Sequence, residues 1–346
     1  AYVGADFRGG VLVGLAQDTR IENVTLINCT SSVTPANNAI SLITNAGLAG
    51  GVLAGEVNNS VLYNCEVRGG GAINTSTAGV TALGGEGLYL GGLVGTASGS
   101  TIEYCRVTPQ VNSAGTGSSP TYTRVSNKYD IAVGAVSGQA VYAGGIAGQI
   151  AGGTAVLDSF STADCYTYCA TYVSVGAGNV GYVGGIAAAA YGSSCTIARS
   201  HYAGNLHSQQ YNAVLVIPVI QKNVNLAGIV EKVGDSVSVT NAYYKPSASN
   251  EAGVTKKITA VGSSASGASY GPQTDDRYRD RTFWEGRDFD LAGGTARSSA
   301  YDANHVNTWT MDFNLGIPVH GTSVKAGLDF PGAGSVSIGA SALAPA

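Results

Sequence analysis

Charged side chains are scarce in this sequence. Of its 346 residues, 12% are Asp, Glu, Lys or Arg, whereas an average soluble protein has about 25%. The net charge is −4, which leaves no basic surface for nucleic acid, so nucleic acid is excluded as a partner. No run of 18 apolar residues occurs, so we expect no membrane insertion. The chain opens at Ala1 without a signal segment, which predicts a mature or trimmed chain. The low charge agrees with an expected location outside the cell or at the cell surface.

Helical periodicity is also missing. No segment keeps the three-and-four spacing of an amphipathic helix for more than a turn or two. Short alternating runs of Val, Ile, Thr and Tyr stand between Gly, Asn and Ser, and this pattern predicts short strands. The 50 glycines do not indicate disorder, because 44% of the residues are hydrophobic. Glycine instead suits the corners between strands.

What the sequence does contain is a block of small residues that recurs six times. The blocks begin at Gly9, Gly50, Gly91, Gly144, Gly184 and Ala227, so the steps between them are 41, 41, 53, 40 and 43 residues. The glycines predicted to form the repeat core are Gly50, Gly51, Gly91, Gly92, Gly144, Gly145, Gly184 and Gly185. An alternating tail follows each block, and Cys29, Cys65 and Cys105 fall at one equivalent place in it.

A repeat of this length cannot bury its apolar face alone, so the repeats are predicted to stack. We expect an all-β fold, a right-handed parallel β-helix (β-solenoid), over residues 1–245. Two coils of about 20 residues per repeat would give ~12 coils and a rod of ~55–60 Å. Residues 246–346 are expected to form an irregular capping or clasping extension with a linker, a charged cluster and a Trp/Pro tail.

The blocks and their tails resemble the GLUG repeat family, which takes its name from a Gly-Leu-any-Gly core. The resemblance covers roughly residues 7–245, and Phe283-Trp284 with the Trp309-to-Val319 segment is similar to the tail that follows such repeats in relatives. It implies a right-handed parallel β-helix of the kind found in secreted and surface-anchored proteins, adhesins included. No catalytic residue is transferred by the resemblance.

The chemistry of an enzyme is hard to find. Polysaccharide lyases and glycosidases on β-helices need two or three converging carboxylates. Only Glu66 with Glu103 or Asp158 is expected on neighbouring coils, and a solvated edge is the favoured interpretation. We therefore predict no enzyme, with no catalytic, cofactor-binding or metal residues. The Cys165-x-x-x-Cys169 spacing has no histidine close enough for a zinc finger.

Cysteines and glycosylation sequons leave alternatives open. Cys165, Cys169 and Cys195 lie near predicted loops, where Cys165 with Cys169 or Cys169 with Cys195 is predicted to form a disulfide. Sequons occur at Asn23, Asn28, Asn58 and Asn74. They would carry glycans in a eukaryotic secretory protein, whereas in an Asn- and Thr-rich bacterial solenoid they follow from composition.

Charge is concentrated between residues 275 and 290, where ten of sixteen residues are ionised. Mixed signs at close spacing predict an ion-pair network that fastens this segment across the rod, or an inter-subunit clasp. The candidate clasp residues are Asp275, Asp276, Arg277, Arg279, Asp280, Arg281, Trp284 and Trp309.

Four excursions separate the repeats, at residues 31–48, 69–88, 108–142 and 203–224. They are predicted as loops or extra coils on one side, with tyrosines such as Tyr142 and Tyr182 as contacts for sugars or for a neighbouring subunit. Together these features predict an extracellular structural or adhesive surface protein, a stiff rod that presents loops and assembles head-to-tail into fibres. Glycans, host surface proteins and copies of itself are the expected partners. The alternatives are a carbohydrate-active enzyme, either a lyase or a glycosidase, and a passive glycan-binding module.

Overall fold

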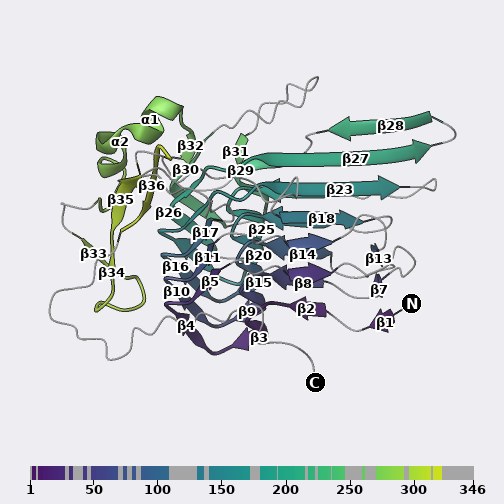
Figure 1. The fold of residues 1–346 in the computed structure, drawn as a ribbon, viewed down its shortest axis with the longest axis horizontal. Coiled ribbons are helices and arrows are strands. Elements are labelled where there is room, and N and C mark those ends of the chain that lie inside the picture. The colour runs from purple at the N-terminus through teal and green to yellow at the C-terminus, as the bar shows by residue number, and fades with distance from the viewer. Residues whose placement is uncertain are drawn as a thin grey trace, which may run out of the picture.

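The computed structural model describes residues 2–4, 7–27, 31–33, 42–44, 48–68, 73–75, 80–82, 87–108, 131–135, 140–171, 180–192, 194–214, 217–222, 225–234, 236–245, 259–261, 270–291, 296–312 and 315–321. Nearly all of these residues are in strands, and the strands stack into large parallel sheets that curl round one axis (Figure 1). The fold is a parallel β-solenoid, as predicted.

Each repeat forms one coil. Val61 pairs with Thr101, 40 positions later, and with Arg20, 41 positions earlier. The prediction of two coils per repeat is therefore wrong, and six coils with a partial seventh give a stack of about 30 Å. The excursions explain the difference, because they contain further strands that widen each coil instead of adding new ones.

A 12-stranded sheet holds two columns of strands on one side of the axis, joined at the glycine blocks. The first column contains β2 (Phe7–Gly9), β8 (Leu48–Gly51), β14 (Leu88–Gly91), β19 (Val141–Gly144) and β24 (Gly181–Gly184). The second contains β3 (Val13–Gln17), β9 (Ala54–Asn58), β15 (Val94–Ser98), β20 (Ala147–Ala151) and β25 (Ala187–Tyr191). In the sixth coil, β29 (Leu226–Val233) serves both columns, and β31 (Thr259–Val261) pairs with it.

An 11-stranded sheet forms the flank that matters for the candidate site. Its third column contains β4 (Arg20–Glu22), β10 (Val61–Tyr63), β16 (Thr101–Glu103) and β21 (Ala155–Leu157). Its fourth contains β5 (Thr25–Ile27), β11 (Glu66–Arg68), β17 (Arg106–Thr108) and β22 (Phe160–Ser161). The longer strands β26 (Thr196–Tyr202) and β30 (Ser238–Tyr244) span both columns, and β32 (Tyr270–Pro272) pairs with β30.

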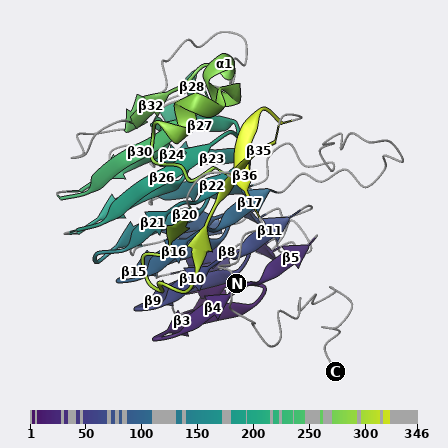
Figure 2. The same cartoon turned by 90° about the vertical axis from the view of Figure 1, so that its left-hand side faces the viewer.

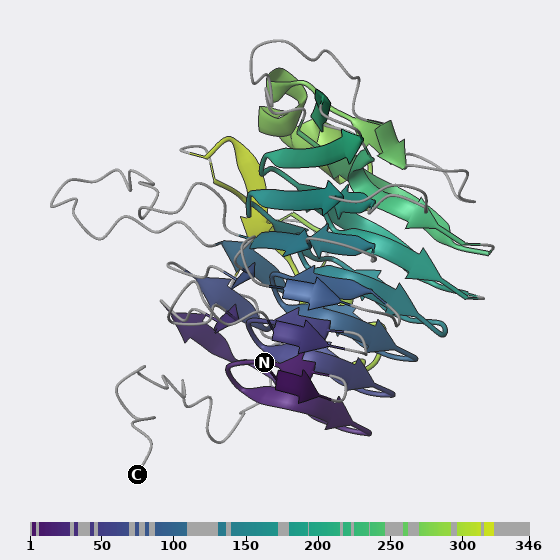
Figure 3. The same ribbon diagram turned by 90° about the vertical axis from the view of Figure 1, so that its right-hand side faces the viewer.

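Two smaller sheets widen the coils. The six-stranded sheet contains β6 (Ser31–Val33), β12 (Ile73–Thr75), β18 (Ile131–Ala135), β23 (Cys165–Thr171) and β27 (Leu206–Val214), and β28 (Ile217–Lys222) adds to it antiparallel to β27. The three-stranded sheet contains β1 (Tyr2–Gly4), β7 (Leu42–Thr44) and β13 (Val80–Ala82). Figure 3 shows the coils stacked in chain order, from the purple N-terminal coil upward to the green ones.

Like residues of successive coils fill the interior. Leu62, Ile102, Val156, Ile197 and Val239 occupy one register position, and all are fully buried. Cys65 and Cys105 are buried at equivalent places beside them, as predicted, whereas Cys29 lies outside the described residues. Such ladders bury apolar surface that no single coil could cover.

The glycine blocks form a corner where two strands meet. A Cβ atom on Gly144 would lie 1.8 Å from the carbonyl oxygen of Ala147, and one on Gly91 would lie 2.0 Å from that of Val94, so a side chain has no space there. The register pairs Gly51, and not Gly50, with Gly91 and Gly144. Gly9 pairs with Gly50, so the first two repeats together are offset by one residue from the later ones in the alignment that the sequence suggests.

Residues 275–321, here called the strap, lie against the 11-stranded sheet. The strap contains α1 (Asp275–Arg279), α2 (Arg281–Glu285), β33 (Arg297–Ser298), β34 (Val306–Asn307), β35 (Trp309–Asp312) and β36 (Ile317–His320). Figure 2 shows the β35–β36 hairpin crossing the strands of the flank. Neither of these short helices is long enough to span a membrane, and the described residues contain no other helix.

Candidate functional site

A rank of corner residues marks the flank beneath the strap. One residue per coil, between the third and fourth columns, has a left-handed backbone: Asn23, Asn64, Tyr104, Asp158, Arg199 and Asn241, with φ between 45° and 57°. Asparagine and aspartate tolerate this conformation, whereas other side chains with a Cβ pay roughly 1–2 kcal/mol for it. The three positions that depart from asparagine, Tyr104, Asp158 and Arg199, are in the third to fifth coils, and Tyr104 and Asp158 contact the strap directly. Strain of this kind is typical of positions whose side chains have a task.

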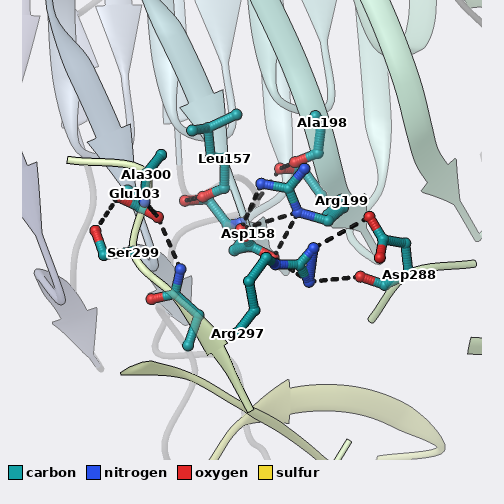
Figure 4. A network of polar contacts seen from close by, with 12 residues as sticks. Glu103, Leu157, Asp158, Ala198, Arg199, Asp288, Arg297, Ser299 and Ala300 are labelled. Atoms are coloured by element: carbon teal, nitrogen blue, oxygen red, sulfur yellow. Dashed lines mark hydrogen bonds and ion pairs between the residues drawn. The ribbon is translucent and has the colours of Figure 1, made fainter. Parts of the chain in front are cut away.

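Asp158 forms a buried ionic cluster with residues from the solenoid and the strap (Figure 4). Its carboxylate is fully buried and accepts hydrogen bonds from Nε and Nη2 of Arg199 at 3.1 and 2.9 Å. From the strap, Arg297 Nη2 lies 3.6 Å from it, and Trp309 Nε1 donates at 3.5 Å. Arg297 also pairs with Asp290 at 3.3 Å. Burial raises the pKa of Asp290, and Arg297 opposes that rise.

Glu103 is the second buried anchor. Its side chain accepts hydrogen bonds from the hydroxyl of Ser299 at 2.6 Å, the backbone N–H of Ala300 at 2.8 Å and the amide of Asn307 at 2.7 Å. All three donors belong to the strap, and Figure 4 shows Ser299 and Ala300 beside this carboxylate. A carboxylate with three donors is well satisfied even at zero exposure.

Glu66 lies in the second coil and binds arginines of the solenoid itself. Arg68 Nε donates to it at 2.7 Å, and Arg106 Nη2 of the next coil at 2.7 Å. Burial opposes the charge of Glu66, but the hydrogen bonds and charges of the two arginines outweigh burial and lower its pKa. Arg106 Nη1 also lies 3.3 Å from Nδ1 of His320 in the strap.

An aromatic layer fills the rest of the contact. Trp284 and Trp309 are fully buried among Tyr278, Phe289 and the solenoid residue Phe160. From the solenoid, His201 stacks on Phe160 with ring centroids 5.0 Å apart, and its Nε2 lies 2.7 Å from the carbonyl oxygen of Pro318. The layer therefore joins strap and solenoid in one apolar cluster.

The strap reaches every coil of the stack. In the first coil, Tyr301 donates to Glu22 at 2.9 Å, and in the second coil Tyr63 donates to Asn307 at 3.1 Å. In the sixth coil, Phe283 packs on Tyr243 with ring centroids 5.2 Å apart. The arrangement ties six coils together along the axis.

This geometry corrects the expectation for the carboxylates. Glu66, Glu103 and Asp158 do lie on neighbouring coils, but they form a buried set of anchors and not a solvated edge. Each already accepts hydrogen bonds from arginine or from the strap, so none is poised to accept a proton from a substrate. Among the described residues, no three His, Cys, Asp or Glu side chains form a metal-binding group.

The predicted clasp residues divide into two groups. Trp284 and Trp309 are buried against the solenoid of their own chain, so an inter-subunit role for these two is wrong. The charged members lie on the surface of the strap, where Asp275 pairs with Lys245 at 3.3 Å and Arg277 with Asp280 at 3.6 Å. Asp276 and Arg279 are exposed, and Arg281 pairs with Glu285 at 2.6 Å. Exposed pairs of this kind add little stability.

The predicted disulfides are wrong. Cys165 and Cys169 stand four positions apart in strand β23, which separates their Cα atoms by about 13 Å, far beyond the reach of a bridge. Cys165 is a thiol whose Sγ lies 3.7 Å from the carbonyl oxygen of Ala163, and Cys195 is a buried free thiol. The side chain of Cys169 lies outside the described residues.

The sequons stay predictions. Asn23 is exposed at a left-handed corner, and Asn58 donates to Glu56 at 2.7 Å. Asn28 and the side chain of Asn74 lie outside the described residues.

Two predicted sugar platforms have their ring faces covered. Tyr142 stacks between Tyr89 and Tyr182, with centroids 4.6 and 5.1 Å apart, and it is almost fully buried. Lys232 Nζ lies 4.8 Å from the centroid of the Tyr182 ring. This ladder stabilises the stack instead of offering open rings.

Sequence reasoning missed the strap residues that complete the site, namely Arg297, Ser299, Asn307 and His320. A signal was available on the solenoid side. The third residue after the start of each third-column strand is regularly Asn or a polar substitute, and a corner that departs from Asn toward Tyr, Asp or Arg points to a tertiary contact.

Comparison with known proteins agrees with this class of fold. Residues 86–112 match the family model described as the GLUG motif, and this stretch includes β14 to β17 of the third coil. The resemblance stated from the sequence is thus confirmed there, and the chain is a parallel β-solenoid that contains a GLUG motif. No curated protein and no solved structure matches the chain.

Proposed function

We propose that the protein is an extracellular or cell-surface module with a structural or adhesive task, in which the braced solenoid holds its loops at a distance and stacks end-to-end with other copies. The observation that carries the proposal is the use of Glu103 and Asp158. Neighbouring coils bring these two carboxylates together, and both hold the strap, which crosses six coils. This use of the carboxylates serves mechanical cohesion and not catalytic turnover.

The distribution of exposed apolar residues supports end-to-end contact. Among the described residues, the large hydrophobic side chains that remain exposed are Leu12, Leu15 and Ile27 in the first coil and Tyr270 in the partial seventh coil. All four are at the two ends of the stack, and none is on its sides. Exposed apolar groups beside strand edges favour association with another sheet.

Negative-stain electron microscopy of the purified protein tests this part of the proposal. We expect fibres whose axial repeat is close to one stack, together with their loss in the double variant Leu15→Lys, Ile27→Lys. The matched control is Glu285→Lys on the strap surface, which should leave fibres intact. Uniform single particles at high protein concentration would rule out head-to-tail assembly.

The alternatives have their own tests. A passive glycan-binding module would bind an oligosaccharide on an array saturably and without turnover. A lyase or glycosidase would release products from polysaccharides and lose that activity in Glu66→Gln or Glu103→Gln. We expect no product release from the wild-type protein.

A further inference from the structure

The histidines are distributed unevenly in this structure. The chain has four, and three of them, His201, His305 and His320, lie between the strap and the solenoid. The apolar core cluster of the coils contains none among the described residues. Groups that change charge near neutral pH are therefore concentrated at one contact.

His201 is fixed in a neutral form by its surroundings. Its Nε2 lies 2.7 Å from the carbonyl oxygen of Pro318, so this nitrogen must carry the hydrogen. Its Nδ1 is buried and has no hydrogen-bond partner within the described part of the chain. A proton on Nδ1 would be a buried unpaired donor among Phe160, Tyr278, Trp284 and Trp309.

His320 comes from the strap and has the same restriction. Its Nε2 donates to the backbone carbonyl of Asp158 at 2.8 Å, while Nη1 of Arg106 lies 3.3 Å from its Nδ1 and donates to it. A proton on Nδ1 would place two donors and two positive charges against each other. The ring also stacks on Tyr104, with centroids 3.9 Å apart.

We propose that the strap is an acid-released latch, which leaves the flank of the solenoid when His201 and His320 take up protons, while the coils stay stacked. The two histidines come from opposite sides of the contact, and neither can be protonated while the strap is closed. Opening uncovers an aromatic rank on the flank with one ring per coil: Tyr63, Tyr104, Phe160, His201 and Tyr243.

The direction of the titration agrees with the geometry. Burial lowers the pKa of His201 to about 3, and the hydrogen bond to Pro318 offsets this only in part. Burial and the charge of Arg106 lower the pKa of His320 well below its ordinary value. Protons therefore bind the open form first, and below about pH 6.5 each histidine shifts the open-to-closed ratio by up to tenfold per pH unit.

Other titratable groups at the contact act differently. Glu22, Glu103 and Asp158 hold the strap as carboxylate acceptors, Glu66 pairs with Arg106, and Asp288 and Asp290 pair with Arg297. Protonation of the first three would also loosen the strap. His305 faces Asp302 at 3.0 Å and Glu22 at 3.7 Å, with Arg20 3.7 Å from Asp302.

The two tryptophans of the chain, Trp284 and Trp309, are both in the strap, so tryptophan emission reports on the strap alone. We expect a red shift of this emission between pH 6.5 and 4, with the far-ultraviolet dichroism of the strands unchanged. The opening ratio should change by up to a hundredfold per pH unit, because two histidines contribute. A simultaneous loss of both signals, or no red shift down to pH 4, would overturn the proposal.

Variants separate histidine from carboxylate titration. His201→Phe and His320→Gln should each reduce the steepness to tenfold per pH unit or less, and the double variant should remove the step above pH 4. His207→Gln, in β27 of the six-stranded sheet, is the matched control and should behave as wild type. Glu103→Gln should loosen the strap at every pH but keep the steepness. If steepness is unchanged in both histidine variants, the latch is not built on them.

Should a variant fail to close its strap at pH 7.5, the wild type still provides a test. Proton uptake measured by potentiometric titration across the emission change should approach two protons per chain. An uptake below one proton would contradict the proposal.

Discussion

Arg199 and Asp158 form a doubly hydrogen-bonded ion pair across two coils, and both occupy the same left-handed corner of their coil. They are 41 positions apart, their φ angles are 47° and 45°, and the guanidinium donates through Nε and Nη2. The strain at the Arg199 corner is thus matched by a buried ion pair that asparagine at that position could not make.

Asp158→Asn should destabilise the protein by about 3–5 kcal/mol, because it leaves Arg199 and Arg297 beside a neutral side chain in a buried site. Urea unfolding followed by the far-ultraviolet dichroism of the strands measures the change. Asp275→Asn is the control, since Asp275 is exposed and pairs with Lys245 on the surface, and its effect should stay within about 0.5 kcal/mol. A loss below about 1 kcal/mol for Asp158→Asn would contradict the structural role of the cluster.

Glu103→Ala should free the strap from the third coil. The variant removes the acceptor of Ser299, Ala300 and Asn307, and the stranded donors should lower the free energy of unfolding by about 2–4 kcal/mol. Hydrogen exchange should increase at residues 297–309 and not in the inner coils. Glu285→Ala, on the strap surface, should change neither quantity measurably, and equal exchange everywhere would argue against a separable strap.

The corner at Asn64 offers a test of backbone strain. Asn64→Gly and Asn64→Ala both lose the 2.8 Å hydrogen bond to Asn23, so their difference isolates the left-handed backbone. The glycine variant should be more stable by about 1 kcal/mol. Thermal unfolding of the two variants gives the answer, and a more stable alanine variant would refute the argument.

Gly144→Ala should disrupt the corner of the fourth coil. Its Cβ atom would lie 1.8 Å from the Ala147 oxygen and 2.9 Å from the Ala188 nitrogen, so backbone must move at a loss of about 3 kcal/mol. Gly286→Ala is the matched control, because that glycine has φ of −70° and its nearest contact would be 3.3 Å. The control should stay within about 1 kcal/mol of wild type.

Glu66 should contribute to stability only at sufficiently high pH. Its pKa in the folded protein is lowered from 4.5, so folding favours the ionised form. The contribution is complete above pH 4.5 and is lost as the pH falls through the folded value. Glu66→Gln should therefore be less stable than wild type by about 1–3 kcal/mol at pH 7, with the gap closing toward pH 3 in urea unfolding. A constant gap at all pH values would show that charge is not the cause.

The solenoid could be predicted because its signals are local. Gly91 and Gly144 begin glycine blocks that must form tight corners, and Leu62 and Ile102 alternate with polar residues in the tails that follow such blocks. Strands, corners and stacking are therefore each visible as a periodic pattern in the sequence. The number of coils could not be predicted, because the periodic sequence pattern does not indicate whether an excursion such as residues 203–224 adds a coil or widens one. Strand β27, inside that excursion, widens the fifth coil.

The candidate site was less accessible from sequence, because it joins segments far apart in the chain. Nothing in the sequence around Glu103 indicates that the side-chain amide of Asn307 donates a hydrogen bond to it. A lone carboxylate in a strand tail is usually solvated. The buried place of Trp284 and Trp309 also depends on where the strap docks. Spacing and composition describe the strap residues and the solenoid residues separately, but they do not show which of these residues contact one another.

The hydrogen bond between Tyr301 and Glu22 has a consequence for the order of assembly. Coil-to-coil pairs join residues about 41 positions apart, so each coil can be added as soon as one more repeat has left the ribosome. Tyr301 meets Glu22 across 279 positions, after every intervening coil has been made. The strap can therefore dock only after the whole stack has formed. A chain whose coils are missing or out of register offers the strap no continuous surface to bind.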